Sequence, residues 1–191
     1  MKIPPLLLEK ASLIFQPRKL KDSATNIENI PTTNFQDNQI SINHQTLLLR
    51  KQINQLEELS KAGADTEKLE FYLDLVSYHI EKGFHTDELF VHFKELLSKN
   101  LSNEKWSIAK DGIEYQKKFG TKLDYLLNTY TSILSNEYFS SKYLSVYRSG
   151  FSYYRKSNLD LNSLSILFSK AMDARLDNKQ LKILEKVLLK E

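Results

Sequence analysis

The chain contains no cysteine, and glycine and proline are scarce, with five and four copies in 191 residues. The lack of cysteine excludes disulfides, thiol catalysis and cysteine-ligated zinc. Because glycine and proline interrupt regular structure, their scarcity favours long helices over many short strands. Three of the four prolines fall in the first 17 residues, so the rest of the chain has few helix breakers. The composition therefore predicts an all-α protein.

Long apolar runs and a strong net charge are also absent. No stretch of about 18 apolar residues occurs, so no membrane span is predicted. The formal net charge of +3 is too small to indicate a polyanionic partner by itself. The length is sufficient for a domain with a hydrophobic core of its own.

The sequence has no recognisable catalytic or metal-binding motif. Glu88 and His92 lie one helical turn apart with His85 near them, but a zinc site needs three or four converging ligands. No Ser/His/Asp arrangement with its motif context occurs, and no glycine-rich phosphate loop. We therefore predict a protein that is not an enzyme and that uses no metal or cofactor.

Residues 1–24 combine basic and apolar side chains. Glu9 and Lys10 break the apolar run and no small-residue cleavage site follows, which excludes a secretory signal. Mitochondrial transit peptides share this basic, amphipathic character, and such a peptide would place the protein in the mitochondrial matrix rather than the cytoplasm. Two alternatives stay open: the leucines dock on the body of the protein, or the segment binds a partner.

Residues 25–41 are rich in Asn, Thr, Gln and Ser, and their apolar residues follow no sustained period. This pattern is typical of a flexible linker. We therefore divide the chain into a flexible N-terminal segment, 1–41, which contains the candidate targeting peptide, and a helical domain, 42–191.

Residues 78–97 have the pattern of a helical hairpin. Gly83 tolerates the left-handed backbone that ends a helix, and Thr86 can cap the next one. The apolar residues that follow recur at the helical period. They are Leu89, Phe93, Leu96 and Leu97.

Equivalents of this hairpin recur along the chain. Gly120 lies 37 residues beyond Gly83, and Asn158 lies 38 residues beyond Gly120. Asparagine, like glycine, visits the left-handed region readily. Similar residues stand at fixed offsets from these three anchors: Tyr78, Tyr115 and Tyr153 five before; Leu75, Gly112 and Gly150 eight before; Phe71, Ile108 and Val146 twelve before; Leu89, Leu126 and Leu164 six after; Phe93, Tyr130 and Phe168 ten after. A half copy closes the chain, with Leu181, Ile183, Val187 and Leu188 at the offsets of a first helix.

Stacked two-helix units bury apolar faces that one unit cannot bury alone. We therefore expect a short right-handed α-solenoid, with a cap helix at 42–62, hairpins at 66–98, 103–135 and 139–175, and a last helix at 179–190. Expected caps are Asp65 or Thr66, a capping box of Thr121 with Asp124, and Asp177. The alternative is a non-repetitive bundle of helices of similar length.

A helix–turn–helix unit of about 35 residues with glycine at its turn resembles the pentatricopeptide and tetratricopeptide repeat families. The resemblance covers residues 66–190. The residues Phe71, Leu75, Val76, Tyr78, Gly83, Leu89, Phe93 and Leu96 are similar to a pentatricopeptide unit, whereas Ile108/Gly112/Tyr115 and Val146/Gly150/Tyr153 resemble a tetratricopeptide first helix. The first resemblance implies an organellar RNA-binding protein, and the second a scaffold that binds peptides.

Residues 138–156 form the most informative patch, because cations and tyrosines alternate and no acidic residue occurs between Glu137 and Asp160. Cations neutralise phosphates and aromatic faces stack on unpaired bases, which is largely how single-stranded RNA is bound. The candidate binding residues are Lys142, Tyr147, Arg148, Tyr154, Arg155 and Lys156, with Lys117, Lys118 and Lys122 extending the strip at the preceding turn. The alternative is that the tyrosines are core residues and the cations a solvated face.

Two functions follow. The first is a non-enzymatic helical-repeat protein that binds single-stranded RNA or a ribonucleoprotein, in mitochondrial gene expression. The second is a protein–protein adaptor that holds a partner peptide or helix on its concave face, which includes a bacterial secretion-related factor.

Overall fold

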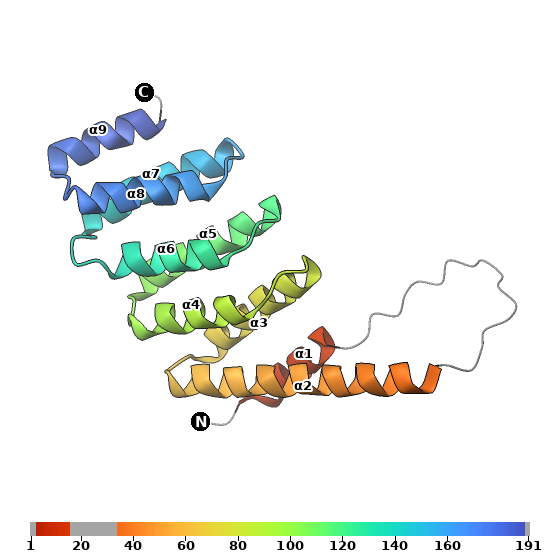
Figure 1. Ribbon diagram of the computed structural model, residues 1–191. Coiled ribbons are helices and arrows are strands. Elements are labelled where there is room, and N and C mark those ends of the chain that lie inside the picture. The colour runs from red at the N-terminus through yellow and green to blue at the C-terminus, as the bar shows by residue number, and fades with distance from the viewer. Residues whose placement is uncertain (1–2, 16–33, 190–191) are drawn as a thin grey trace, which may run out of the picture. The chain divides into compact units, whose positions relative to one another are not determined.

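The computed structural model describes residues 3–15 and 34–189, and within these ranges every regular element is a helix (Figure 1). The all-α prediction is confirmed for this part of the chain. The chain forms two compact units, Met1–Leu73 and Asp74–Glu191, and the division falls inside helix α3 (Thr66–Glu81).

The first unit contains α1 (Pro5–Ile14), α2 (Asn34–Lys61) and the first half of α3. Helix α1 packs against α2, and Leu7 and Ala11 are its buried residues. Of the alternatives for the N-terminus, this contact favours docking. In the same unit Tyr72 of α3 donates a buried hydrogen bond to Gln55 Oε1 of α2 at 2.8 Å.

Helix α2 begins at Asn34, eight residues before the boundary expected at Ile42. The expected linker therefore divides into 25–33, which lies outside the described residues, and 34–41, which is helical. No glycine or proline occurs between residues 32 and 62. Nothing in this stretch therefore stops a helix from extending toward its N-terminus, although its polar composition gives no apolar period.

The second unit contains the rest of α3 and six further α-helices. They are α4 (Asp87–Ser98), α5 (Asn103–Gln116), α6 (Asp124–Ser135), α7 (Ser141–Lys156), α8 (Leu161–Asp173) and α9 (Asn178–Leu189), and a short 3-10 turn, η1 (Lys117–Phe119), extends α5. Within this unit α6 packs between α4 and α8, while α7 packs between α5 and α9 (Figure 1).

The three turn anchors adopt the expected backbone. Gly83, Gly120 and Asn158 have φ values of 74°, 66° and 56°, in the left-handed region. Each residue ends a first helix and lets the chain reverse into the second. The hairpin boundaries predicted from the sequence are therefore close to those observed, from α3–α4 to α7–α8.

The caps follow the prediction only in part. Asp177 accepts hydrogen bonds from the backbone N–H groups of Lys179 and Gln180 at 2.8 and 2.9 Å, as expected. Asp65 accepts from Lys68 N–H at 2.9 Å. Thr86 occupies the cap position of α4 but its side chain makes no capping bond.

The predicted capping box of Thr121 with Asp124 is wrong. Helix α6 begins at Asp124 itself, so this residue lies in the first turn rather than three positions beyond the cap. The Thr121 hydroxyl instead accepts a hydrogen bond from Gln116 Nε2 at 3.2 Å. Gln116 of the preceding helix, α5, thus uses the Thr121 hydroxyl that the capping box would have directed to the backbone of α6.

Candidate functional site

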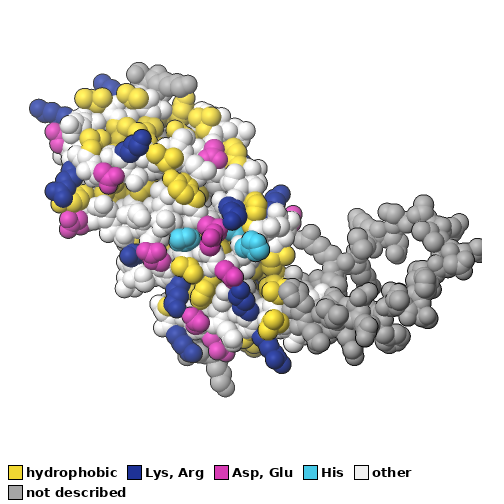
Figure 2. Space-filling view, in the orientation of Figure 1, with side chains coloured by type: hydrophobic (Ala, Val, Ile, Leu, Met, Phe, Trp, Pro, Cys, Tyr) yellow, Lys and Arg dark blue, Asp and Glu magenta, His cyan; other side chains and the backbone are white. Residues whose placement is uncertain are grey.

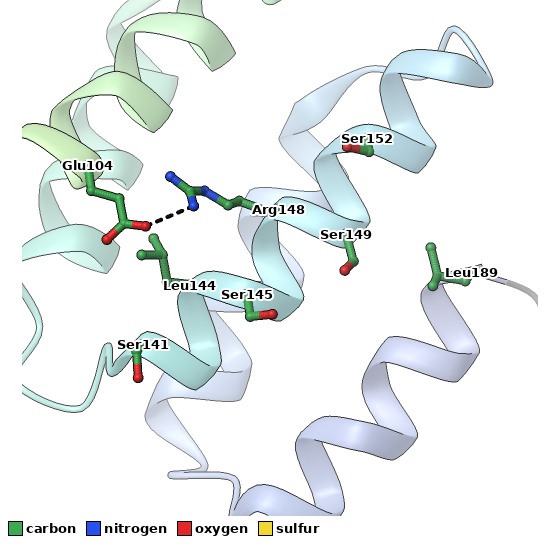
Figure 3. A pocket seen from close by; sticks show the side chains of 8 residues that line it. All are labelled: Glu104, Ser141, Leu144, Ser145, Arg148, Ser149, Ser152 and Leu189. Atoms are coloured by element: carbon green, nitrogen blue, oxygen red, sulfur yellow. Dashed lines mark ion pairs between the residues drawn. The ribbon is translucent and has the colours of Figure 1, made fainter.

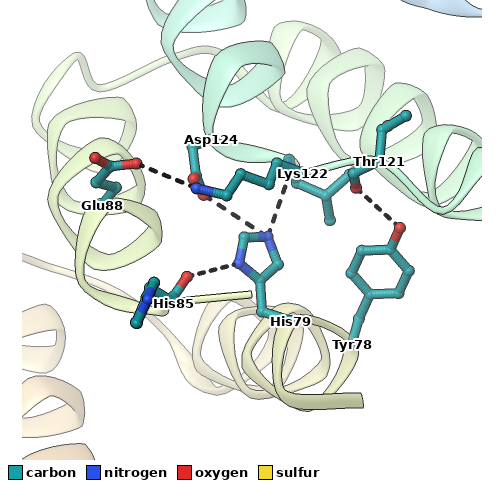
Figure 4. A network of polar contacts seen from close by, with 8 residues as sticks. Tyr78, His79, His85, Glu88, Thr121, Lys122 and Asp124 are labelled. Carbon is teal, nitrogen blue, oxygen red and sulfur yellow. Dashed lines mark hydrogen bonds and ion pairs between the residues drawn. The ribbon is translucent and has the colours of Figure 1, made fainter. Parts of the chain in front are cut away.

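The end of α3 is bonded to the turn before α6 (Figure 4). The Tyr78 hydroxyl donates to the carbonyl oxygen of Thr121 at 2.9 Å. His79 is fully buried, and its Nε2 accepts from the N–H of Leu123 at 3.4 Å. Its Nδ1 lies 3.0 Å from the His85 carbonyl oxygen, to which it donates. Two adjacent side chains thus join one hairpin to the next.

The end of α5 is bonded to the turn before α8 in the same way. The Tyr115 hydroxyl donates to the carbonyl oxygens of Leu159 and Tyr154 at 3.0 and 3.1 Å. Gln116 is fully buried, and its Oε1 accepts from the N–H of Leu161 at 3.0 Å. Its Nε2 donates to Asp160 Oδ2 at 2.7 Å.

The two sets of bonds use equivalent positions. Tyr78 and Tyr115 stand five residues before their anchors, and each bonds to the residue directly after the next anchor. His79 and Gln116 stand four before, and each accepts from the residue three after the next anchor. Equivalent residues of successive hairpins therefore make equivalent contacts, although an imidazole replaces an amide.

Asp124 lies beside the first of these junctions. It is 6% exposed, and its Oδ1 is 3.7 Å from His79 Nε2. Burial raises the pKa of this carboxyl, and the positive charge of nearby Lys122 partly opposes the rise. Lys122 itself forms an ion pair with Glu88 at 3.9 Å (Figure 4).

Aromatic and cationic side chains gather where the turns after α5 and α7 meet. Lys118 Nζ lies 3.6 Å from the ring centroid of Tyr115 and donates to Asn158 Oδ1 at 2.7 Å. The Tyr115 ring makes edge contacts with Phe119 and Phe151, with centroids 5.6 and 5.9 Å apart. These contacts tie the two turns to each other.

The chain directly beyond Phe151 adds two half-buried tyrosines and two exposed cations. Tyr153 and Tyr154 are in edge contact at 6.2 Å, and Arg155 and Lys156 form no ion pair with any described residue. We call the whole group the turn-edge cluster. Its members are Tyr115, Lys118, Phe119, Phe151, Tyr153, Tyr154, Arg155 and Lys156.

Tyr147, predicted to be a binding residue, lies in the core. It is 1% exposed, and its hydroxyl donates to the Tyr130 hydroxyl at 2.7 Å. Its ring packs edge-on against Phe168 with centroids 4.8 Å apart. Burial raises the pKa of both tyrosines above the usual range of the phenol. The prediction for Tyr147 is wrong, because an enclosed ring has no face to offer a base.

Arg148, also a predicted binding residue, is paired with a carboxylate. Its guanidinium lies 2.8 Å from Glu104 Oε1 of α5, and each side chain is 51% exposed. The pair lies at one wall of a groove of about 600 Å³ along α7 (Figure 3). Ser145 and Ser149 line the groove, and Ser149 donates to Glu185 Oε1 of α9 at 2.8 Å.

The remaining predicted cations separate into two kinds. Lys117 pairs with Glu114 at 2.7 Å, as Lys122 does with Glu88, so a carboxylate partly offsets each charge. Lys142 is half-buried in the first turn of α7, away from the turn after that helix. Of the nine predicted binding residues, four lie at the turn edge: Lys118 and Tyr154 contact other members of the cluster or its turn, and Arg155 and Lys156 are the last two residues of α7 beside them.

Sequence reasoning missed Tyr115, Phe119 and Phe151 as members of this site. Tyr115 was assigned only to the repeat, five residues before its anchor, and Phe151 lies in the patch at 138–156 but was not among the candidate binding residues. Their closeness in sequence to a turn anchor could have indicated the site, because residues next to an anchor lie near the end of the hairpin. The sequence did not indicate that two turns meet there.

No family model, curated protein or solved structure matches the chain. Within residues 3–15 and 34–189 no cluster of three or more potential metal ligands occurs. None of the helices in these ranges is long and apolar enough to cross a membrane.

Proposed function

We propose that this chain is a non-enzymatic helical-repeat protein that binds single-stranded RNA, free or within a ribonucleoprotein, at the turn-edge cluster. The proposal includes a short right-handed α-solenoid of hairpins like those of the pentatricopeptide and tetratricopeptide families. The equivalent bonds of Tyr78 with Tyr115, and of His79 with Gln116, support it, because a non-repetitive bundle has no reason to reuse the same positions.

The observation that carries the RNA proposal is the composition of the turn-edge cluster. Arg155 and Lys156 are exposed and have no carboxylate partner among the described residues, and Lys118 is held on an aromatic face. Half-buried Tyr153 and Tyr154 lie beside them. Cations next to accessible aromatic rings suit phosphates next to unstacked bases, whereas a duplex keeps its bases stacked inside.

The proposed compartment is the mitochondrial matrix, with the cytoplasm as the alternative. The basic, amphipathic residues 1–24 support import. The burial of Leu7 and Ala11 supports a segment that stays in the mature protein rather than one that is removed. The two roles are compatible if the segment directs import and is retained.

Fluorescence anisotropy with a labelled single-stranded RNA tests the proposal. Three neutralised phosphates give a slope of about −2 for log affinity against log salt, so affinity is expected to fall roughly 20-fold between about 50 and about 200 mM salt. The triple variant K118E/R155E/K156E is expected to lose binding at the lower salt concentration. The variant K179E/K182E/K186E on α9 has the same change in net charge and serves as the matched control.

Equal loss of binding in both triple variants would indicate attraction to net charge alone and would contradict the site. Absence of binding by the unaltered protein at about 50 mM salt would remove the RNA proposal altogether. Because all six substituted side chains are exposed, both triple variants are expected to keep their helices. Circular dichroism of each variant checks this.

A second candidate function is a protein adaptor. Large apolar side chains are exposed on the second helices of the three hairpins, with Val91, Tyr125 and Ile166 at 58%, 51% and 40%. Tyr125 and Ile166 also line a groove of about 300 Å³ between α6 and α8 that contains one charged residue, Lys170. Such a surface suits a peptide or helix, and a stoichiometric protein partner that survives nuclease treatment would favour this function.

A further inference from the structure

Helix α9 has the apolar pattern of a first helix, and no described helix covers the face that carries Ile183 and Val187. In the first helices of the two preceding hairpins, the residues twelve and eight positions before the anchor are buried. They are Ile108 and Gly112 in α5, and Val146 and Gly150 in α7. A Cβ atom on Gly112 would clash with Tyr130 of α6. The second helix of the same hairpin therefore covers this face.

The corresponding face of α9 is open. Ile183 and Val187 occupy the same two positions, and they are 62% and 68% exposed. Leu181 and Leu188 on the other side of α9 are buried, and Leu188 approaches the α-carbon of Gly150 closely enough that an added Cβ would lie 3.3 Å from it. Helix α9 thus packs on α7, while no described residue covers the face of α9 that carries Ile183 and Val187. Figure 2 shows hydrophobic side chains and basic residues reaching the surface at the α8–α9 end.

Three lysines border this apolar face. Lys179, Lys182 and Lys186 are exposed on α9, and none of them forms an ion pair with a described residue. They lie along one edge of the stripe formed by Ile183 and Val187. An occupant of the face therefore meets an apolar strip with positive charge on one side, which favours acidic residues on the occupant. A second copy packed antiparallel on the same face would instead oppose lysines to lysines.

We propose that the open face of α9 binds an amphipathic helix of a partner protein, which has acidic residues along one edge of its apolar stripe and lies on α9 as α6 lies on α5. The expected occupant is a helix, since a helix covers this face in the preceding hairpins. The lysines specify its charge. The proposal is independent of RNA binding, because the turn-edge cluster lies on α5, η1 and α7.

Photo-crosslinking in cells that express the full chain tests this directly. A benzophenone amino acid replaces Val187, and the crosslinked peptide is identified by mass spectrometry. The expected result is one predominant adduct with an amphipathic segment that contains several Asp or Glu residues. A benzophenone at Val91 of α4, which is similarly exposed at 58%, is the matched control and is expected not to give this adduct.

Charge and apolar variants complete the test. K179E/K182E/K186E and I183D are each expected to lower the adduct yield at Val187 at least about tenfold. K118E/R155E/K156E is expected to leave it unchanged even after nuclease treatment. An adduct with a second copy, with lipid or with a segment lacking acidic residues would overturn the proposal, and so would the absence of any adduct.

Discussion

Replacing Gly112 by alanine is expected to lower the free energy of unfolding of the second unit by about 2 to 4 kcal/mol. The added methyl group would occupy the space of the Tyr130 ring and hydroxyl. Tyr130 is fully buried and accepts the hydroxyl hydrogen bond of Tyr147, so it cannot move aside without breaking that bond. Urea unfolding followed by circular dichroism measures the loss.

Gly150 provides the matched control because it stands at the equivalent position of the next hairpin. There the nearest atoms to an added Cβ are the terminal carbons of Leu164 and Leu188, at 3.0 and 3.3 Å. Flexible side-chain ends can yield by rotation, and alanine gains about 1 kcal/mol over glycine in a helix. The G150A variant is therefore expected to stay within about 1 kcal/mol of the unaltered protein. An equal loss in both variants would contradict the role of Tyr130.

Replacing Tyr147 by alanine is expected to destabilise the second unit by about 3 to 5 kcal/mol, the usual cost of removing a large buried aromatic side chain. The ring is enclosed between Tyr130 and Phe168, so its loss leaves a cavity and an unpaired Tyr130 hydroxyl. Tyr147→Phe keeps the ring and loses one hydrogen bond, so its cost is expected to be about 1 kcal/mol. Urea unfolding compares the two variants.

If Tyr154 contributes to RNA binding, its replacement is expected to show the reverse of the Tyr147 pattern, with lower RNA affinity and little change in stability. Its ring is half-buried at the turn edge, and the bond that Tyr115 donates to this residue goes to the backbone, which alanine retains. We expect Tyr154→Ala to change stability little and to weaken RNA binding about tenfold, the order of one lost stacking contact. Tyr147→Phe is expected to leave RNA affinity unchanged. Reduced affinity in Tyr147→Phe with normal affinity in Tyr154→Ala would contradict the assignment.

The sequence predicted the turns well because each depends on one local property. Gly83, Gly120 and Asn158 tolerate positive φ, and that tolerance is visible in a single residue. The burial of Tyr147 was harder to predict. A wide apolar arc on a first helix leaves the tyrosines at its border free to face inward or outward, and tertiary packing decides between the two.

Pairing between distant residues could not be predicted from local patterns. Arg148 and Glu104 are 44 positions apart, and Lys122 and Glu88 are 34 apart, yet both pairs meet in the folded unit. These contacts depend on how successive hairpins pack. The same packing brings Lys118 to Asn158 and thereby forms the turn-edge cluster.

The equivalence of the hairpins is the central claim, and a comparison of two substitutions at His79 tests it most directly. If His79 fills the same position as Gln116, glutamine can accept the Leu123 N–H bond through its Oε1 as Gln116 does for Leu161. We expect His79→Gln to unfold in urea within about 1 kcal/mol of the unaltered protein, and His79→Ala to lose about 2 to 3 kcal/mol. Equal destabilisation by glutamine and alanine would contradict the equivalence on which the repeat and the site depend.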